Sequence, residues 1–141
     1  MIEIAAPATG NQVEDAFAVR VEVFVDEQGI PRSEELDELD ATAVHCVAYA
    51  DGVPVGAGRM LPGDGYAKIG RMAVLAEHRG SGVGGLVLQA LEREGAARGI
   101  RWFRLSAQIT ARGFYERHGY TAVGDVYDEV DIPHIAMEKR V

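Results

Sequence analysis

A glycine-rich turn at residues 79–85 carries the strongest chemical signal in the chain. Its sequence, Arg-Gly-Ser-Gly-Val-Gly-Gly, is followed at once by the apolar, helix-like run 86–91. Glycines let an anion approach the backbone, and the first turn of a helix offers unpaired N–H groups and the positive end of the helix dipole. Arg79 adds a positive charge at the start of the turn. This segment therefore favours binding of a pyrophosphate.

Two phosphate-binding patterns overlap in this turn. Gly80, Gly82 and Gly85 satisfy G-x-G-x-x-G, the dinucleotide fingerprint, whereas R-x-x-G-x-G is satisfied by Arg79, Gly82 and Gly84. The dinucleotide pattern requires a strand directly before the first glycine and an acidic residue about 20 residues later, at the end of the next strand. The preceding strand-like run ends near residue 75, and the next one is followed by Ser-Ala-Gln. We therefore favour the second pattern and keep a dinucleotide-dependent oxidoreductase as an alternative.

Length and composition favour a single globular domain. The chain has 141 residues, of which 48% are hydrophobic and 26% charged, and this suits one folded domain spanning residues 1–141. No window approaches the roughly 20 apolar residues that a membrane helix needs, and the N-terminus lacks a signal-peptide pattern. The single cysteine, Cys46, permits no internal disulfide, which agrees with a reducing compartment. We expect a cytoplasmic protein that does not bind membranes.

The net charge limits the class of partner. The formal charge at neutral pH is −8, whereas nucleic-acid binding needs a basic surface. We therefore expect no nucleic acid and favour a small cationic molecule. A cluster of acidic residues could steer such a molecule, although a run of acids is more often a solvated loop. The cluster consists of Asp26, Glu27, Glu34, Glu35, Asp37, Glu38 and Asp40.

The first third of the chain predicts a strand, a helix and a loop. Residues 1–5 alternate as a short strand, and Asn11 with Glu14 matches a helix capping box. The acidic segment 31–40 has neither a helical nor a strand period, and we predict a loop there. The apolar stripe of the helix, which runs out before Gly29, consists of Val13, Phe17, Val21 and Phe24.

The rest of the chain predicts hairpins around a strand–helix–strand unit. Asp51-Gly52 favours an antiparallel hairpin, and Gly70 inside a later strand indicates a bulge or a close backbone approach. A helix from 83 to about 98 between strands 66–75 and 101–107 predicts a parallel, right-handed connection. Further strands are expected at 43–50, 53–61, 120–126 and 133–140, with a short helix at 110–118.

Four segments in this order resemble the Gcn5-related N-acetyltransferase (GNAT) family. They are residues 69–74, 79–84, 105–108 and 111–120. The resemblance covers essentially the whole chain and implies the α/β GNAT acyl-CoA N-acyltransferase fold, with a central mixed, mostly antiparallel sheet flanked by helices. Residues 23–28, the acidic loop and residues 132–137 are similar to a subgroup of small bacterial acetyltransferases of the ElaA and YjcF type.

The resemblance implies acetyl-CoA as co-substrate. The backbone of Met72, Ala73 and Val74 would pair with the pantetheine arm like an added strand. Gln108 stands where many relatives carry asparagine, and its longer side chain would hydrogen-bond the pantetheine. The pyrophosphate would be held by Arg79, Gly80, Ser81, Gly82, Val83, Gly84 and Gly85. The histidines lack metal-ligand spacing, and we expect no metal ion.

An amine that attacks a thioester needs a base for its proton and a proton donor for the sulfur. By resemblance, Tyr115 donates to the departing thiolate and also contacts the cofactor, whereas Phe114 is expected to pack the short helix on the sheet. Glu27 and His134 are the candidate bases, because a carboxylate that is buried has a raised pKa and a histidine titrates near neutrality. His45 is a third candidate, and a water chain could replace all three.

The resulting hypothesis is an N-acetyltransferase that acetylates a primary amine by direct attack in a ternary complex. The acceptor would be a small-molecule amine or a peptide amine, with a cationic one favoured. A second hypothesis is a module of the same fold that binds coenzyme A without turnover, because anion binding is all that the turn guarantees. The sequence leaves a homodimer open.

Overall fold

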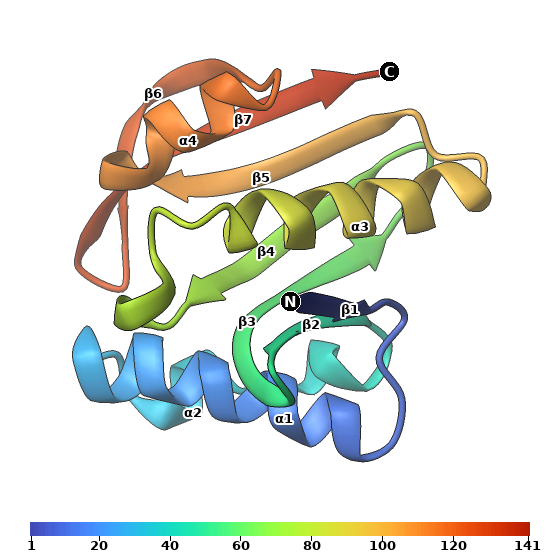
Figure 1. Cartoon of the computed structure of the whole chain (residues 1–141). Coiled ribbons are helices and arrows are strands. Elements are labelled where there is room, and N and C mark those ends of the chain that lie inside the picture. The colour runs from blue at the N-terminus through green and yellow to red at the C-terminus, as the bar shows by residue number, and fades with distance from the viewer.

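The computed structural model describes residues 1–141 as a mixed seven-stranded sheet with helices on both faces (Figure 1). The strand order is β1-β2-β3-β4-β5-β7-β6, and only β4 and β5 are parallel neighbours. The strands are β1 (Ile2–Ala5), β2 (Val44–Ala50), β3 (Val53–Pro62), β4 (Ala67–Val74), β5 (Trp102–Gln108), β6 (Thr121–Glu129) and β7 (Ile132–Arg140). The expected order of elements and the mixed, mostly antiparallel sheet are confirmed.

Four α-helices and four 3₁₀- or π-helical segments connect the strands. They are α1 (Asn11–Arg20), its π-helical continuation η1 (Val21–Glu27), α2 (Arg32–Glu35), η2 (Glu38–Ala41), η3 (Ala76–His78), α3 (Val83–Ala97), η4 (Ile109–Ala111) and α4 (Arg112–Arg117). The segment that we expected to be a loop therefore contains two short helical turns. Neither α3 nor any other helix combines the length and the apolar composition that crossing a membrane requires.

The first helix differs from the expected capping box. Its N-cap is Gly10, and no side chain caps it. The amide oxygen of Gln12 instead accepts a hydrogen bond from the backbone N–H of Thr9, at 3.0 Å. The expected roles of Asn11 and Glu14 are therefore wrong, because the chain turns into the helix at a glycine with φ of 55°, a conformation that glycine adopts at low cost.

Each face of the sheet buries its own hydrophobic cluster. On one face, Val87, Leu88 and Leu91 of α3 are buried, whereas Leu86, the first residue of the apolar run 86–91, is 40% exposed. Cys46 lies in this cluster, and burial raises the pKa of its thiol to about 12. On the other face, the first helix buries Ala16, Val19, Val23 and Phe24 against the sheet.

The sheet splits between its two parallel strands. The pairing of β4 with β5 covers only residues 67–69 and 103–105, although β4 continues to Val74 and β5 to Gln108. In Figure 1 the two strands diverge toward their arrowheads. A register shift between β3 and β4 marks a bulge at this point, and Arg71 has a left-handed φ of 53°. The bulge that Gly70 indicated therefore lies one residue later.

Candidate functional site

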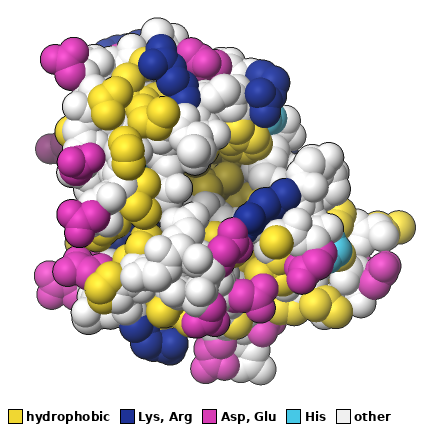
Figure 2. Space-filling view, turned by 90° about the vertical axis from the view of Figure 1, so that its left-hand side faces the viewer, with side chains coloured by type: hydrophobic (Ala, Val, Ile, Leu, Met, Phe, Trp, Pro, Cys, Tyr) yellow, Lys and Arg dark blue, Asp and Glu magenta, His cyan; other side chains and the backbone are white.

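The divergence of β4 and β5 opens a cleft of about 610 Å³. Figure 2 shows it as a hollow with hydrophobic side chains at its bottom and a Lys or Arg side chain at its rim. Its walls come from η1, the acidic segment, β4, β5 and the β6–β7 hairpin. The predicted site residues that line it are Met72, Ala73, Val74, Arg79, Gln108, Tyr115 and His134. Glu27 lies at the margin, because it is not among the lining residues.

One wall of the cleft is the edge of β4 that β5 leaves unpaired. Residues 70–74 have no strand partner on the β5 side, so backbone groups there are available to an extended ligand. The Val74 carbonyl accepts a hydrogen bond from Nε of Arg79, at 2.9 Å. The pairing of a ligand with Met72, Ala73 and Val74 stays a prediction, and the Val74 carbonyl is already occupied by Arg79.

The glycine-rich turn follows β4 and η3 and leads directly into α3. Gly80 and Gly82 have left-handed φ angles of 78° and 88°, and Gly82 is the N-cap of α3. No side chain caps this helix, so its first N–H groups are free for an anion. A Cβ at Gly84 would lie 3.3 Å from the Phe114 ring, and one at Gly85 would lie 2.9 Å from His118. The turn therefore packs closely against α4 and leaves the start of α3 uncapped, and pyrophosphate binding there stays a prediction.

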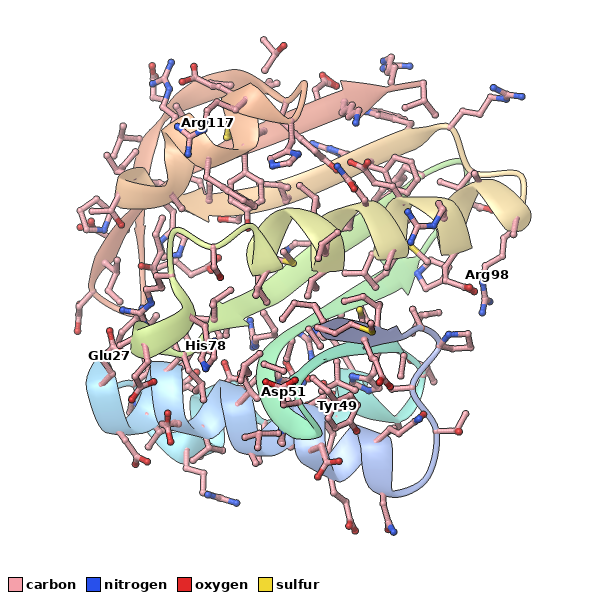
Figure 3. All side chains as sticks on the ribbon, in the orientation of Figure 1. Glu27, Tyr49, Asp51, His78, Arg98 and Arg117 are labelled. Carbon is pink, nitrogen blue, oxygen red and sulfur yellow. The ribbon has the colours of Figure 1, made fainter.

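Arg79, the positive charge at the start of the turn, is ion-paired with Glu27. Its Nη1 and Nη2 donate to the two carboxylate oxygens of Glu27, at 2.7 and 2.6 Å. Figure 3 shows Glu27 at the end of η1, close to the segment that carries His78. The hydrogen bonds from Arg79 hold the pKa of Glu27 below its usual value. A raised pKa of Glu27 would require a buried carboxylate, but Glu27 is exposed.

Tyr115 projects from α4 into the cleft and is only 7% exposed. Its ring packs edge-on against Phe114 and Tyr120, at centroid distances of 5.0 and 5.9 Å. Burial raises the pKa of Tyr115, so the hydroxyl keeps its proton and can act as a hydrogen-bond donor. Phe114 packs against the larger core cluster, as expected.

His134 and Gln108 face the cleft from neighbouring strands. They are directly paired across β5 and β7. His134 is 5% exposed, and its Nδ1 lies 2.7 Å from the carbonyl oxygen of Ile132. The Gln108 amide donates to the side-chain oxygen of Gln28, at 2.8 Å, so that the residue directly after η1 contacts β5. The structure thus brings His134, Gln108 and Tyr115 to one cavity.

His45 lies outside the cleft, so the third candidate base has no access to a substrate there. Its Nε2 lies 2.8 Å from the carbonyl oxygen of Asp40, and its ring contacts Phe17 edge-on at 5.3 Å. It is buried, and its Nδ1 has no hydrogen-bond partner. These contacts make His45 a structural residue of β2.

The acidic segment is largely neutralised by arginines. Arg20 is fully buried and binds Glu35 through Nε at 2.7 Å and Asp40 through Nη1 at 2.8 Å. Burial raises the pKa of Glu35 despite this pairing. Burial acts in the same sense on Asp40, but hydrogen bonds from Arg20 and Arg59 outweigh it and lower the pKa of Asp40 to about 2.

Two further arginines bind this segment from the sheet. Arg59 donates to Asp37 and Asp40, at 2.7 and 2.8 Å. Arg71, at the bulge of β4, lies 3.2 Å from carboxylate oxygens of both Glu35 and Asp37. These arginines were not predicted, because nothing in the local pattern pairs a strand residue with a segment 19 to 36 positions away. Their pairing leaves much of the acidic cluster without free charge for steering an acceptor.

Comparison with known proteins agrees with this geometry. Residues 6–141 match the family model of the acetyltransferase (GNAT) domain. The chain is 46% identical over 130 residues to the N-acetyltransferase YjcF of Bacillus subtilis, covering 92% of this chain and 93% of that protein. It is 29% identical to Escherichia coli ElaA, with a TM-score of 0.86 over 99% of this chain and 100% of the other.

Two further structures resemble this one. An acyl-CoA N-acyltransferase from Pseudomonas aeruginosa is 30% identical, with a TM-score of 0.86 over 99% of both chains. The PaiA N-acetyltransferase from Thermoplasma acidophilum, solved in complex with coenzyme A, shares the fold at 19% identity and a TM-score of 0.76, covering 100% of this chain and 99% of that one. The expected family and fold are confirmed, and the chain belongs to the GNAT acetyltransferases as an acyl-CoA N-acyltransferase.

Proposed function

We propose that this protein transfers an acetyl group from acetyl-CoA to a primary amine by direct attack in a ternary complex. The observation that carries the proposal is the continuity of two binding surfaces: the unpaired edge of β4 leads through η3 to the uncapped start of α3 at Gly82. An extended arm along the strand would therefore end with its diphosphate at the free N–H groups of the helix. The related fold of a protein solved with coenzyme A supports this placement.

The residues of the cleft fit this co-substrate. Met72, Ala73 and Val74 would hold the pantetheine arm, and the backbone from 79 to 85 would hold the diphosphate. Gln108 would hydrogen-bond the arm once its contact with Gln28 is exchanged. When bound, the thioester supplies an acyl carbon that is activated for attack by an amine. A backbone N–H near Met72 is the proposed donor to the charge that develops on the acyl oxygen, a role that typically contributes about 3 kcal/mol.

Tyr115 is the proposed donor to the sulfur. The raised pKa of Tyr115 keeps its hydroxyl protonated. The hydroxyl therefore stabilises the leaving thiolate by hydrogen bonding and gives it a proton as the C–S bond breaks. His134 is the proposed base, because it lines the cleft and its Nδ1 is already bonded to Ile132. Glu27 is the second candidate, but its pairing with Arg79 lowers its pKa and reduces its basicity.

The test is release of free thiol from acetyl-CoA in the presence of amines. Polyamines, amino acids, aminoglycosides, arylalkylamines and peptides would be compared with a blank without acceptor. Thiol release above the blank, with the acetylated amine identified by mass spectrometry, supports the transferase. Coenzyme A binding without release above the blank would instead favour a binding module. Stabilisation of the protein by NADH and not by acetyl-CoA would favour the dinucleotide alternative.

A further inference from the structure

We infer that five polar side chains on the cleft face of β5, β7 and β6 form the acceptor site, in which the Glu129 carboxylate and His134 Nε2 together bind the ammonium group of the acceptor. We call this set the polar row; it consists of Ser106, Gln108, Tyr127, Glu129 and His134. All but Tyr127 line the cleft. The inference rests on the proposed function and names the substrate class and the residues that recognise it.

The polar row lies on one face of the sheet. Leu105 and Ala107 of β5 are buried in the core on the α3 side, so Ser106 and Gln108 project from the opposite face. His134 is paired with Gln108 on one side and with Tyr127 on the other. Side chains at paired positions share a face, which places His134 in the middle of the row.

Neighbouring contacts hold the imidazole of His134 in place. The ring of Tyr127 stacks on it, with centroids 6.2 Å apart and an interplanar angle of 30°. The hydroxyl of Tyr127 is in turn hydrogen-bonded to the hydroxyl of Ser106. Two strands therefore support the orientation of one buried ring at the wall of the cleft.

The contact of Nδ1 decides where the proton of neutral His134 resides. Nδ1 lies 2.7 Å from the carbonyl oxygen of Ile132, and a carbonyl oxygen can only accept, so Nδ1 carries the hydrogen. Nε2 then has the lone pair. It lies 3.7 Å from Oε2 of Glu129, too far for a hydrogen bond between them. That spacing lets a single ammonium group donate to both atoms.

The charges along the cleft favour a particular class of amine. Of the arginines that line it, Arg59 binds Asp37 and Asp40, Arg71 binds Glu35 and Asp37, and Arg79 binds Glu27. Each of these guanidinium charges already faces at least one carboxylate, so none offers an uncompensated charge to a carboxylate of the acceptor. Lys68 also lines the cleft, but at the closed end, where β4 and β5 still pair.

Apolar side chains of the first helix and of the segment after it also line the cleft. They include Phe24, Ile30 and Leu39. An amine with an apolar body would bury that body against them and present its ammonium to Glu129 and His134. The acceptor class is therefore a primary amine on an apolar body without a carboxylate beside the amino group.

The proton transfers balance with these residues. His134 Nε2 takes one proton from the ammonium, and the freed lone pair forms the C–N bond. The C–S bond breaks with its electron pair on sulfur, which receives the proton of Tyr115. The nitrogen then gives up a second proton, which restores Tyr115 through solvent, while His134 returns its proton to solvent. An ammonium ion and a thioester thus yield an amide, a thiol and one proton.

The test compares two acceptors that differ in charge. Phenethylamine is an ammonium ion at neutral pH, whereas aniline is neutral and needs no carboxylate partner. Glu129→Gln should raise the KM for phenethylamine about tenfold, the usual effect of losing a charge-assisted hydrogen bond. The KM for acetyl-CoA and the rate with aniline should not change, and Glu129→Asp should restore part of the phenethylamine affinity. Equal losses with both amines, or no loss with phenethylamine, would overturn the inference.

Glu116→Gln is the matched control. Its side chain is 49% exposed, against 45% for Glu129, and it lies outside the cleft lining. Glu116→Gln should change the kinetics with neither phenethylamine nor aniline. A change as large as that of Glu129→Gln would show that the Glu129 effect is an unspecific result of lost charge, and the ammonium site would be rejected.

A binding measurement separates this inference from the proposed function. In protein saturated with coenzyme A, phenethylammonium should shift the ring signals of His134 in the NMR spectrum, assigned with His134→Gln. The same titration of Glu129→Gln should leave them in place. If these shifts occur but no amine promotes thiol release, the ammonium site stands and the transferase proposal fails. If phenethylamine is acetylated while the His134 signals stay unchanged, the ammonium site is wrong and the transferase stands.

Discussion

The guanidinium of Arg79 holds the Glu27 carboxylate through two hydrogen bonds, of 2.7 and 2.6 Å, and a third bond ties its Nε to the Val74 carbonyl. This arrangement joins the end of η1 to the glycine-rich turn. Each Nη group of the arginine keeps a second N–H, but the Glu27 carboxylate already compensates the charge of Arg79. We therefore expect Glu27 to compete with the diphosphate of the co-substrate for Arg79.

Glu27→Gln should tighten coenzyme A binding. The substitution removes the competing charge, and exposed ion pairs of this kind correspond to a gain of about two- to fivefold in affinity. Titration calorimetry with coenzyme A measures this gain. Pantetheine, which lacks the diphosphate, should bind the variant and the wild type equally well. Weaker coenzyme A binding by the variant would contradict the competition and indicate that the ion pair assembles the site.

Tyr115→Phe should lower kcat about 100-fold, in the range seen when a proton donor is lost. The coenzyme A affinity should stay nearly unchanged, because phenylalanine retains the ring that packs against Phe114 and Tyr120. Steady-state kinetics and calorimetry on the same preparation check both values. If affinity and kcat fell by the same factor, Tyr115 would be a structural residue and not the donor.

Gly82→Ala should weaken coenzyme A binding, because an L-residue at φ of 88° strains the start of α3. Gly99→Ala is the matched control at the other end of the helix, with φ of 81°, and at both positions a Cβ would meet no atom within 4 Å. Each variant should lose about 1–2 kcal/mol of unfolding free energy. Only Gly82→Ala should also lose coenzyme A affinity, about tenfold. Comparable affinities in the two variants would speak against the turn as the diphosphate site.

The pairing of Asp40 predicts the response of stability to acid. The pKa of Asp40 is about 2 in the folded protein against 3.8 for an unperturbed group, so its contribution is complete above 3.8 and is lost as the pH falls toward 2. The loss should be about 2 kcal/mol. Glu35 has a raised pKa, which changes the stability with pH in the opposite direction. Glu35 is present in both the wild type and Asp40→Asn, so its effect cancels in the difference between their unfolding free energies.

Urea denaturation across this acidic range checks the prediction. The free-energy difference between the wild type and Asp40→Asn should shrink by about 2 kcal/mol as the pH is lowered. The exposed Asp125 of β6 supplies a control, and the difference between wild type and Asp125→Asn should stay constant. A constant difference for Asp40→Asn as well would mean that its ion pairs with Arg20 and Arg59 do not stabilise the fold.

Much of the fold followed from local patterns in the chain. The Asp51-Gly52 turn, the glycine-rich segment before α3 and the apolar stripes all act between residues close in sequence, so spacing reveals them. The parallel connection from β4 to β5 could also be predicted, because a helix between two strands of one sheet leaves few possible topologies. A predicted contact was wrong where a neighbouring residue could take the same role. At the start of α1, Gly10 and Gln12 take the place of the expected capping box.

The amino-acid sequence by itself determined the family pattern and the glycine-rich turn, and it supplied Tyr115 and His134 as candidate site residues. Only the tertiary structure decided how charges meet across the molecule: Glu27 pairs with Arg79 and not with a substrate, and Arg20, Arg59 and Arg71 neutralise the acidic segment. It also placed Glu129 beside His134, through the pairing of β6 with β7. The physical reason is that an ion pair depends on distance in space and on burial, and neither is encoded in the spacing of residues along one element.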